Sequence, residues 1–204
     1  MKEIRLRKTI DRVATFYEIY KVGYEGGQGY RKSSDLIKLS RCIYKMLATS
    51  IVNPEKTIFM DLGCGDGRVN VLFSYFVKKS IGIEIDADIL FEHKRHEKKL
   101  EKVLVEEGLI LPPSNIYLQH GDSLEDSTLR KVYENTDIIF SDIDIFYTYI
   151  TLHDLFAEKI SNEAKRGAYF VLYGFHKILP NYPGLRLLSE GNTLEEIVAI
   201  YRKE

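Results

Sequence analysis

The sequence predicts a doubly wound α/β fold built on a mostly parallel sheet. Strand-like and helix-like segments alternate along most of the chain, which is the pattern of an α/β domain. Residues 59–70, FMDLGCGDGRVN, read as a buried strand, a glycine-rich turn and the start of a helix. Residues 185–201 read as two strands joined by a tight turn at Gly191-Asn192. Because tight turns join antiparallel strands, we expect a C-terminal antiparallel hairpin, with one antiparallel strand at the end of the sheet.

The composition bounds the class of protein before any motif is considered. The 204 residues, 45% of them hydrophobic, are enough for one sizeable core. The 29 Lys and Arg nearly balance the 30 Asp and Glu, so the chain lacks the basic excess typical of nucleic-acid-binding proteins. The charged start and the absence of a long apolar run argue against secretion and a membrane span. With only Cys42 and Cys64, we expect no disulfide and a cytoplasmic location.

Residues 1–56 are expected to form an N-terminal helical extension to a compact domain that comprises residues 57–204. One helix is expected near 9–21, and a second follows a cap at Ser33 or Ser34 and ends before Asn53-Pro54. Between them lies a glycine-rich segment, GYEGGQGYRKSS, at 23–34. Its glycines suit either a mobile lid over a ligand or a solvated linker.

Five strands and the helices between them are expected before the terminal hairpin. The strands are short runs rich in β-branched and aromatic residues, and they are placed at 57–60, 80–85, 115–120, 137–141 and 167–173. The helices are placed at 68–79, 88–107, 123–134 and 147–160. The charged run at 93–99, within the long second of these helices, is expected to be a solvated helix face.

Acidic residues coincide with the ends of the first three strands, at Asp61, Glu84 and Asp122. Open α/β sheets bind ligands at the carboxyl ends of their strands, where helix N-termini favour hydrogen-bond acceptors. A carboxylate after the second strand can accept both hydroxyls of a ribose. Each residue alone reads equally well as a solvated turn residue. Together with the glycine turn, however, they predict a site for an adenosine-like ligand.

These motifs resemble those of the class I S-adenosylmethionine-dependent methyltransferases. The resemblance is carried by MDLGCGDG at 60–67, GIEID at 82–86 and HGDSLED at 120–126. It implies a seven-stranded Rossmann-like sheet and S-adenosyl-L-methionine as the cofactor. It also implies that the methionine part is held by Asp61, Gly63, Cys64 and Gly65, the ribose by Glu84, and the adenine by Ile85, Asp122 and Ser123. In many family members a lid covers the cofactor where segment 23–34 lies here, which makes Gln28 and Tyr30 further candidate contacts.

In such enzymes the acceptor is recognised after the fourth strand, where this chain reads IIFSDIDIFYTY at 138–149. Enzymes that methylate nucleic-acid bases or glutamine often have Asp or Asn followed by Pro-Pro and an aromatic residue there, and this chain does not. Asp142, Asp144 and Tyr147 are the candidate catalytic residues. Their order, a strand-end Asp followed by Asp and Tyr, is similar to that in metal-dependent catechol-type O-methyltransferases. A second ligand pair of that family is replaced here by Tyr173-Gly174, so we expect no metal.

Residues 61–68 are also similar to the first motif of protein lysine methyltransferases of the same fold, which is DLGSGDGR-like. An amine must lose its proton before it attacks, and a nearby carboxylate or tyrosine hydroxyl could assist. We therefore expect a methyltransferase, with protein lysine slightly favoured as its acceptor. The alternatives are a small-molecule O-methyltransferase, an RNA methyltransferase, or a non-catalytic module that binds the cofactor. A protein or small-molecule acceptor is favoured over nucleic acid.

Overall fold

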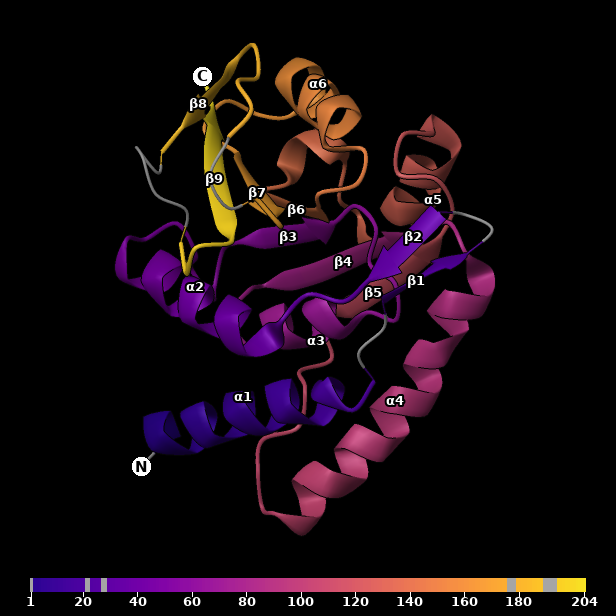
Figure 1. The fold of residues 1–204 in the computed structure, drawn as a ribbon, viewed down its shortest axis with the longest axis vertical. Helices are drawn as coiled ribbons and strands as arrows, with labels where there is room; N and C mark the ends of the chain where they lie inside the picture. Colours follow the sequence, from indigo (N-terminus) through magenta and orange to yellow (C-terminus); the bar gives the residue numbers. More distant parts are fainter. Residues whose placement is uncertain (1, 21–22, 27–28, 176–178, 189–193) are drawn as a thin grey trace.

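The computed structural model describes residues 2–20, 23–26, 29–175, 179–188 and 194–204. Its centre is a seven-stranded sheet of order β5-β4-β3-β6-β7-β9-β8, with helices on both faces (Figure 1). The strands are β3 (Ile58–Asp61), β4 (Lys79–Glu84), β5 (Ile116–His120), β6 (Ile145–Tyr149), β7 (Tyr169–Tyr173), β8 (Leu185–Leu187) and β9 (Val198–Lys203). This order confirms the predicted doubly wound fold, including the seven strands that the resemblance implied.

Neighbouring strands from β5 to β7 are parallel, and β9 is antiparallel to both of its neighbours. The predicted pairing of the two C-terminal strands is confirmed. Because β9 is inserted between β7 and β8, the antiparallel strand is second from the edge of the sheet and not at its end. The tight turn predicted at Gly191-Asn192 lies outside the described residues.

The helices are α1 (Lys2–Glu18), α2 (Leu36–Ala48), α3 (Arg68–Ser74), α4 (Ala87–Glu106), α5 (Asp126–Thr136) and α6 (His153–Glu163). The cap of α2 is Asp35, and not Ser33 or Ser34, because the Asp35 carboxylate accepts hydrogen bonds from two backbone N–H groups in the first turn. The predicted helix 68–79 is too long, since α3 ends at Ser74 and β4 begins at Lys79.

The fourth strand of the sheet differs most from the prediction. Two apolar runs, 138–140 and 143–149, follow each other here, and both have the composition of a strand. The structure uses the second run as β6 and folds Phe140–Asp142 as a 3-10 helix, so the predicted strand at 137–141 is wrong. The predicted helix start at 147 is wrong for the same reason. Asp142 and Asp144 consequently precede the strand that they were expected to follow.

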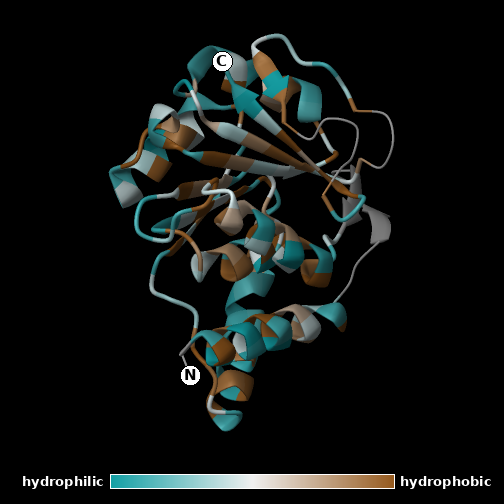
Figure 2. Ribbon diagram, turned by 90° about the vertical axis from the view of Figure 1, so that its left-hand side faces the viewer, coloured by the Kyte–Doolittle hydropathy of each residue, from teal (hydrophilic) through white to brown (hydrophobic). Residues whose placement is uncertain are grey.

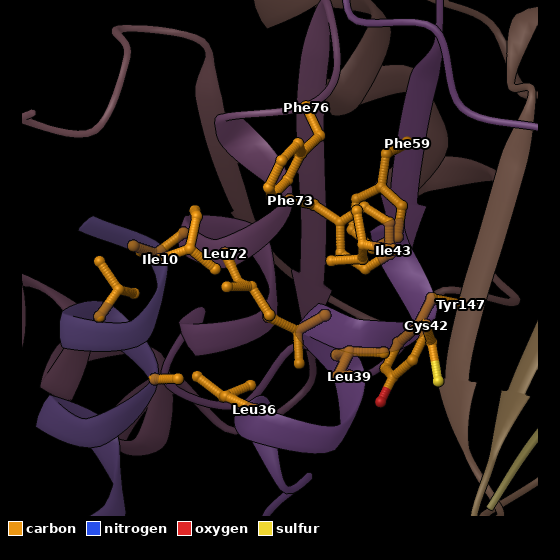
Figure 3. Close-up of a cluster of buried hydrophobic side chains, with 14 of the residues drawn as sticks. Ile10, Leu36, Leu39, Cys42, Ile43, Phe59, Leu72, Phe73, Phe76 and Tyr147 are labelled. Carbon is orange, nitrogen blue, oxygen red and sulfur yellow. The ribbon is translucent and has the colours of Figure 1, made fainter. Parts of the chain in front are cut away.

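Both faces of the sheet are buried, and alternate residues along each strand enter different hydrophobic clusters. Phe59 and Tyr147 enter the cluster to which α1 to α4 contribute, whereas Met60 and Phe146 enter the cluster of α5 and α6. Figure 2 shows the interior strands as mainly hydrophobic and the outer surfaces of the helices as largely hydrophilic. Figure 3 shows Ile10 in the same cluster as Phe59, so the N-terminal helices share a core with the sheet.

The glycine-rich segment forms a hairpin of β1 (Gly23–Gly26) and β2 (Gly29–Lys32) rather than an irregular linker. Tyr30 lies in β2, paired with Glu25 of β1, and Gln28 lies outside the described residues. In the part of the chain that the structure describes, no helix has the length and apolar character needed to cross a membrane.

Candidate active site

The glycine turn follows β3 and is hydrogen-bonded to the end of β4. The backbone N–H of Cys64 donates to a β4 carbonyl (2.9 Å), and that of Gly65 donates to the Glu84 carboxylate (2.7 Å). Gly65 and Gly67 have left-handed φ angles of 56° and 75°, which glycine adopts without strain. A side chain at Gly67 would also collide with the His93 ring, at 2.8 Å. The turn therefore requires glycine at both positions.

Asp61 ends β3 with a buried carboxylate, 1% exposed, that no Lys, Arg or His of the described residues neutralises. It accepts one long hydrogen bond, of 3.3 Å, from the backbone N–H of Gly63. The pKa of Asp61 is raised to about 8, mainly by burial; the Gly63 hydrogen bond opposes this shift, and the nearby charge of Glu84 adds to it. Such a group gains most from a ligand that brings a positive charge.

Glu84 and Ile85 stand at the end of β4, beside the glycine turn. The Glu84 carboxylate accepts from the backbone N–H of Gly65 and, at 3.0 Å, from that of Asp86. The side chain is only partly buried, so its remaining lone pairs can accept hydrogen bonds from ligand hydroxyls. Ile85 is 50% exposed and provides an apolar surface beside this carboxylate.

Asp122 and Ser123 follow β5, the next strand along the sheet. Asp122 is partly exposed, and one of its oxygens accepts from the backbone N–H of Leu124 (2.9 Å). Ser123 is buried, and its hydroxyl donates to the Leu62 carbonyl at 2.6 Å. Cys64 is buried as well, behind the turn. Ser123 and Cys64 therefore support the turn from the inside, whereas Asp122 is accessible to a ligand.

The predicted acidic residues thus lie at the ends of three adjacent strands, β3, β4 and β5. Together they offer a buried carboxylate without a cation, a partly exposed carboxylate and an exposed apolar side chain. These features suit a ligand with a cationic group, neighbouring hydroxyls and a flat ring, and the residues present fit S-adenosylmethionine.

Tyrosines stand at the carboxyl ends of β6 and β7. The buried Tyr147 hydroxyl shares a 2.7 Å hydrogen bond with Ser34, and the Tyr173 hydroxyl accepts from the backbone N–H of Asp35 at 2.9 Å. Burial raises the pKa of Tyr147 far above its usual value, so this hydroxyl stays protonated. The Tyr149 ring packs against Tyr173 at 5.3 Å, and its hydroxyl has no hydrogen-bond partner among the described residues. No signal in the sequence connected Ser34, Asp35 and Tyr149 with the site. Their partners are distant in the sequence, and no motif marks these residues.

Asp142 and Asp144 lie before the amino end of β6, on the side of the sheet opposite the carboxyl ends that carry Asp61, Glu84 and Asp122. The Asp144 carboxylate accepts from the backbone N–H of Ile58 (2.7 Å), at the start of β3, and pairs with Lys165 at 2.5 Å. The Asp142 carboxylate accepts from the backbone N–H of Ile139 at 3.1 Å. The Asp144 contact holds the amino ends of β3 and β6 together, and the Asp142 contact closes the 3-10 helix that precedes β6. This position corrects the catalytic assignment made from the sequence, and we give neither aspartate a part in the chemistry.

A buried ionic network that the sequence did not reveal lies under the glycine turn. Asp66 accepts two hydrogen bonds of 2.8 Å from Arg68 and lies 2.9 Å from Nδ1 of His96. Arg68 also donates to the carbonyl of Tyr20, just past α1 (2.8 Å). Burial alone would raise the pKa of Asp66, but the hydrogen bonds from His96 and Arg68 outweigh it and hold this pKa well below the usual range.

His96 and His93 correct the expectation of a solvated face at 93–99. His96 is 8% exposed, and His93 Nδ1 lies 3.1 Å from the Asp66 carbonyl, so both face the turn. Asp66, Glu92 and His96 offer ligand atoms within 4.8 Å of one another. Because Arg68 already neutralises Asp66, we describe this group as an ion-pair network and not as a metal centre.

Comparison with known proteins gives one family match. The family model for the histone methylation protein DOT1 matches residues 38–172. A search of curated proteins finds no match. Among solved structures, the yhhF protein of Escherichia coli, named as a methyltransferase, has the same fold, with a TM-score of 0.54, 14% identity and coverage of 90% of this chain and 98% of that one. An RNA methyltransferase from Salinibacter ruber aligns with a TM-score of 0.48 and 19% identity over 79% of this chain and 88% of that one.

Proposed function

Because the chain belongs to the DOT1 family of histone methylation proteins, it is an S-adenosylmethionine-dependent methyltransferase, and we propose that it methylates the ε-amino group of a lysine in a basic protein segment. The family membership supplies the reaction. The charge and the aromatic side chains around the site point to the acceptor.

We assign the cofactor to the carboxyl ends of β3, β4 and β5. Asp61 would hold the ammonium of the methionine part, because its buried carboxylate lacks a cation. Glu84 would accept the ribose hydroxyls, and Ile85 would pack against the adenine, whose edge faces Asp122. The cofactor supplies a methyl group on a cationic sulfur, so the protein contributes mainly alignment and the exclusion of water.

The observation that carries the proposed acceptor is the charge of the strand-end loops. Residues 61–67, 84–88, 120–126 and 149–155 follow or end β3, β4, β5 and β6, and they contain several Asp and Glu but no Lys or Arg. The acidic residues also suit the N-termini of the helices that begin here. Asp61 is mostly protonated below pH 8 and Asp66 is paired with Arg68, so neither adds much to the negative field of these loops. The remaining acidic residues, of which Asp88, Glu125 and Asp154 are exposed, attract a cationic acceptor and repel the phosphates of RNA. A lysine within a basic segment is therefore favoured over a nucleic-acid base.

Tyrosines would form the wall that the acceptor amine meets. Tyr147 cannot remove a proton from the amine, because its hydroxyl is buried, bonded to Ser34 and held protonated. Tyr149 lies two residues further along β6, beyond the position that pairs with Asp61. Its partly buried ring packs against Tyr173, and among the described residues its hydroxyl has no hydrogen-bond partner. We assign it the orientation of the amine through its aromatic face, with the proton released to water.

Transfer of labelled methyl groups tests the proposal. The purified protein is incubated with methyl-labelled S-adenosylmethionine and a cell extract, in parallel with extracts treated with protease or nuclease. We expect label that is lost with protease, resists nuclease and appears as methyllysine after acid hydrolysis. The Asp61→Asn variant should lose this transfer, and Asp142→Asn, altered at the far edge of the sheet, should retain it. Label that is lost with nuclease, or that stays in small molecules, would contradict the lysine assignment.

The compartment follows from the cysteines. Cys42 and Cys64 are both buried and free. Free, buried thiols suit a reducing compartment, and we propose that the protein works in the cytoplasm.

A further inference from the structure

The connection between β6 and α6 presents large apolar side chains to solvent, directly beside the tyrosines. Ile150, Leu152 and Leu155 are 37%, 54% and 47% exposed. They follow Tyr149, and therefore lie at the same edge of the sheet as Asp61. We call these three side chains the apolar ledge. Exposed apolar residues scattered singly need no explanation, but three within six consecutive residues at the edge of a site do.

Leu152 is locally unfavourable for two independent reasons. Its φ of 53° is left-handed, a region in which the Cβ of any residue except glycine is crowded by the backbone. It is also the N-cap of α6, where Ser, Thr, Asp, Asn or Gly is preferred, and it makes no capping hydrogen bond. Because the leucine side chain is exposed, its burial does not offset the strain of the left-handed φ or the missing capping hydrogen bond. Such violations of local preference are expected where function competes with stability.

The base of the ledge is fixed by packing. The ring of His153, the first residue of α6, hydrogen-bonds to the Tyr182 hydroxyl (2.7 Å) and packs edge-on against Phe175 at 5.1 Å. After β7, Gly174 has a φ of 113°, and a Cβ there would lie 3.3 Å from the Cβ of Ile150. The backbone under the ledge is therefore held close on two sides, which favours a preformed surface over one that rearranges on binding.

The charge around the ledge limits the kind of partner. Residues 149–158 contain Asp154 and Glu158, both exposed, and no Lys or Arg. The loops after β3, β4 and β5 also contain Asp or Glu and no Lys or Arg, whereas residues 174–184 after β7 contain Lys177 and no Asp or Glu. Nucleic acid and anionic lipid are disfavoured by this field, whereas a basic protein segment with an apolar side chain complements it in both charge and polarity.

We propose that the apolar ledge binds a hydrophobic side chain of the acceptor protein, next to the lysine that receives the methyl group. This inference rests on the proposed lysine methylation and adds to it a sequence preference. The lysine would enter beside Tyr149, while a neighbouring apolar residue of the same segment covers Leu152 and Leu155. Burial of that residue would strengthen acceptor binding without touching the cofactor.

Synthetic peptides test the preference directly. One set carries a single lysine in an arginine- and serine-rich background with Leu at one neighbouring position, and the matched set has Ser there instead. With labelled S-adenosylmethionine, we expect kcat/KM to be about tenfold higher for the Leu peptide, as burial of a leucine side chain predicts. Leu152→Gly and Leu155→Ser should abolish this ratio by raising the peptide KM, with kcat and cofactor affinity retained.

Two further variants and one physical measurement separate a docking role from a structural one. Ile139→Ser alters a side chain that is 50% exposed before β6, at the other edge of the sheet, and should leave the ratio unchanged. Leu152→Gly relieves the left-handed strain and should raise Tm by about 2–4 °C while the peptide preference is lost. A merely structural role would couple lost activity to lost stability instead.

The outcomes that overturn the inference are distinct. Equal use of the Leu and Ser peptides by the unaltered protein, with no effect of Leu152→Gly or Leu155→Ser, would remove the ledge from acceptor recognition while leaving lysine methylation intact. Methylation of no lysine peptide, with S-adenosylhomocysteine still bound in calorimetry, would overturn the proposed function and the ledge with it. A dimer in light scattering that Leu155→Ser converts to monomer would assign the ledge to self-association.

Discussion

The guanidinium of Arg68 binds both oxygens of Asp66 at 2.8 Å, inside the protein and directly beneath the glycine turn. The same guanidinium donates to the carbonyl of Tyr20, so the turn is tied to the end of α1. His96 approaches the pair from α4 at 2.9 Å. A segment that binds a ligand with backbone atoms needs a fixed backbone, and this ion pair adds to the hydrogen bonds that hold the turn to β4.

Removal of one member of this pair should be strongly destabilising. Arg68→Met leaves the buried Asp66 carboxylate with the His96 ring but without the guanidinium, and we expect it to lower the free energy of unfolding by about 3–5 kcal/mol. The double variant Asp66→Asn/Arg68→Met should lose clearly less than Arg68→Met alone. Urea unfolding of the three proteins measures this. Equal losses in the single and double variants would contradict the buried-charge explanation.

Asp61 should make the unliganded protein less stable as the pH rises. Its pKa is about 8 in the folded state against an ordinary value of 3.8, so the folded protein holds a proton that the unfolded chain releases. The stabilisation is complete below pH 4 and is lost as the pH rises through 8, with a slope of up to about 1.4 kcal/mol per pH unit. Urea unfolding between pH 5 and pH 8 should show a flatter profile for Asp61→Asn. The same slope in both proteins would contradict the raised pKa.

Cofactor affinity should show the opposite dependence on pH. The Asp61 carboxylate must be ionised to pair with an ammonium, so below pH 8 affinity should weaken by up to about tenfold for each unit of lower pH. Calorimetry with S-adenosylhomocysteine at pH 6, 7 and 8 measures it. Asp61→Asn should bind weakly and with little pH dependence over this range. A wild-type affinity that does not change with pH would place the ammonium elsewhere.

Alanine substitutions at Gly82 and Gly63 should have different effects, the first on stability and the second on cofactor affinity. A Cβ at Gly82 would meet the Asn70 side chain at 2.6 Å and Cys64 Cβ at 2.8 Å, so Gly82→Ala should cost about 1–3 kcal/mol of stability. A Cβ at Gly63 has nothing within 4 Å, so Gly63→Ala should change stability by less than about 0.5 kcal/mol. We expect Gly63→Ala to weaken cofactor binding nonetheless, because its methyl group enters the space in front of the turn. Undiminished affinity in calorimetry would show that the cofactor does not approach Gly63.

Tyr147 and Tyr149 of β6 should contribute differently, the first to stability and the second to methyl transfer. Tyr147→Phe removes the hydrogen bond to the buried Ser34 and should cost about 1 kcal/mol of stability, with kcat nearly unchanged. Tyr149→Leu, which removes the partly buried ring but keeps an apolar side chain against Tyr173, should lower kcat/KM for the acceptor with little effect on stability. Thermal unfolding and single-turnover methyl transfer measure the two effects. A large fall in kcat for Tyr147→Phe would return that hydroxyl to the chemistry.

Much of the cofactor site could be predicted because its signals are local. The turn after β3 needs glycine at 65 and 67, and Asp61, Glu84 and Asp122 each end a strand that is recognisable from its own composition. Parallel strands bring their carboxyl ends to one edge, so the three acidic positions could be related without knowledge of any contact. The same local reasoning identified the α/β alternation and the pairing of the last two strands.

The tertiary structure decided what local patterns leave ambiguous. Two apolar runs had the composition of β6, and the structure uses the second one. Asp144, just before that run, accepts a hydrogen bond from the start of β3. Asp142 and Asp144 therefore lie at the amino ends of the strands, away from the cofactor positions. The sequence predicted that the histidines of α4 face solvent. In the structure α4 packs against the glycine turn, and this contact buries His96.

The sequence by itself therefore determined the fold class and the strand-end positions that we assign to the cofactor. The acceptor wall, the ion pair under the turn and the exposed leucines depend on residues brought together from distant segments, and no periodicity encodes those contacts.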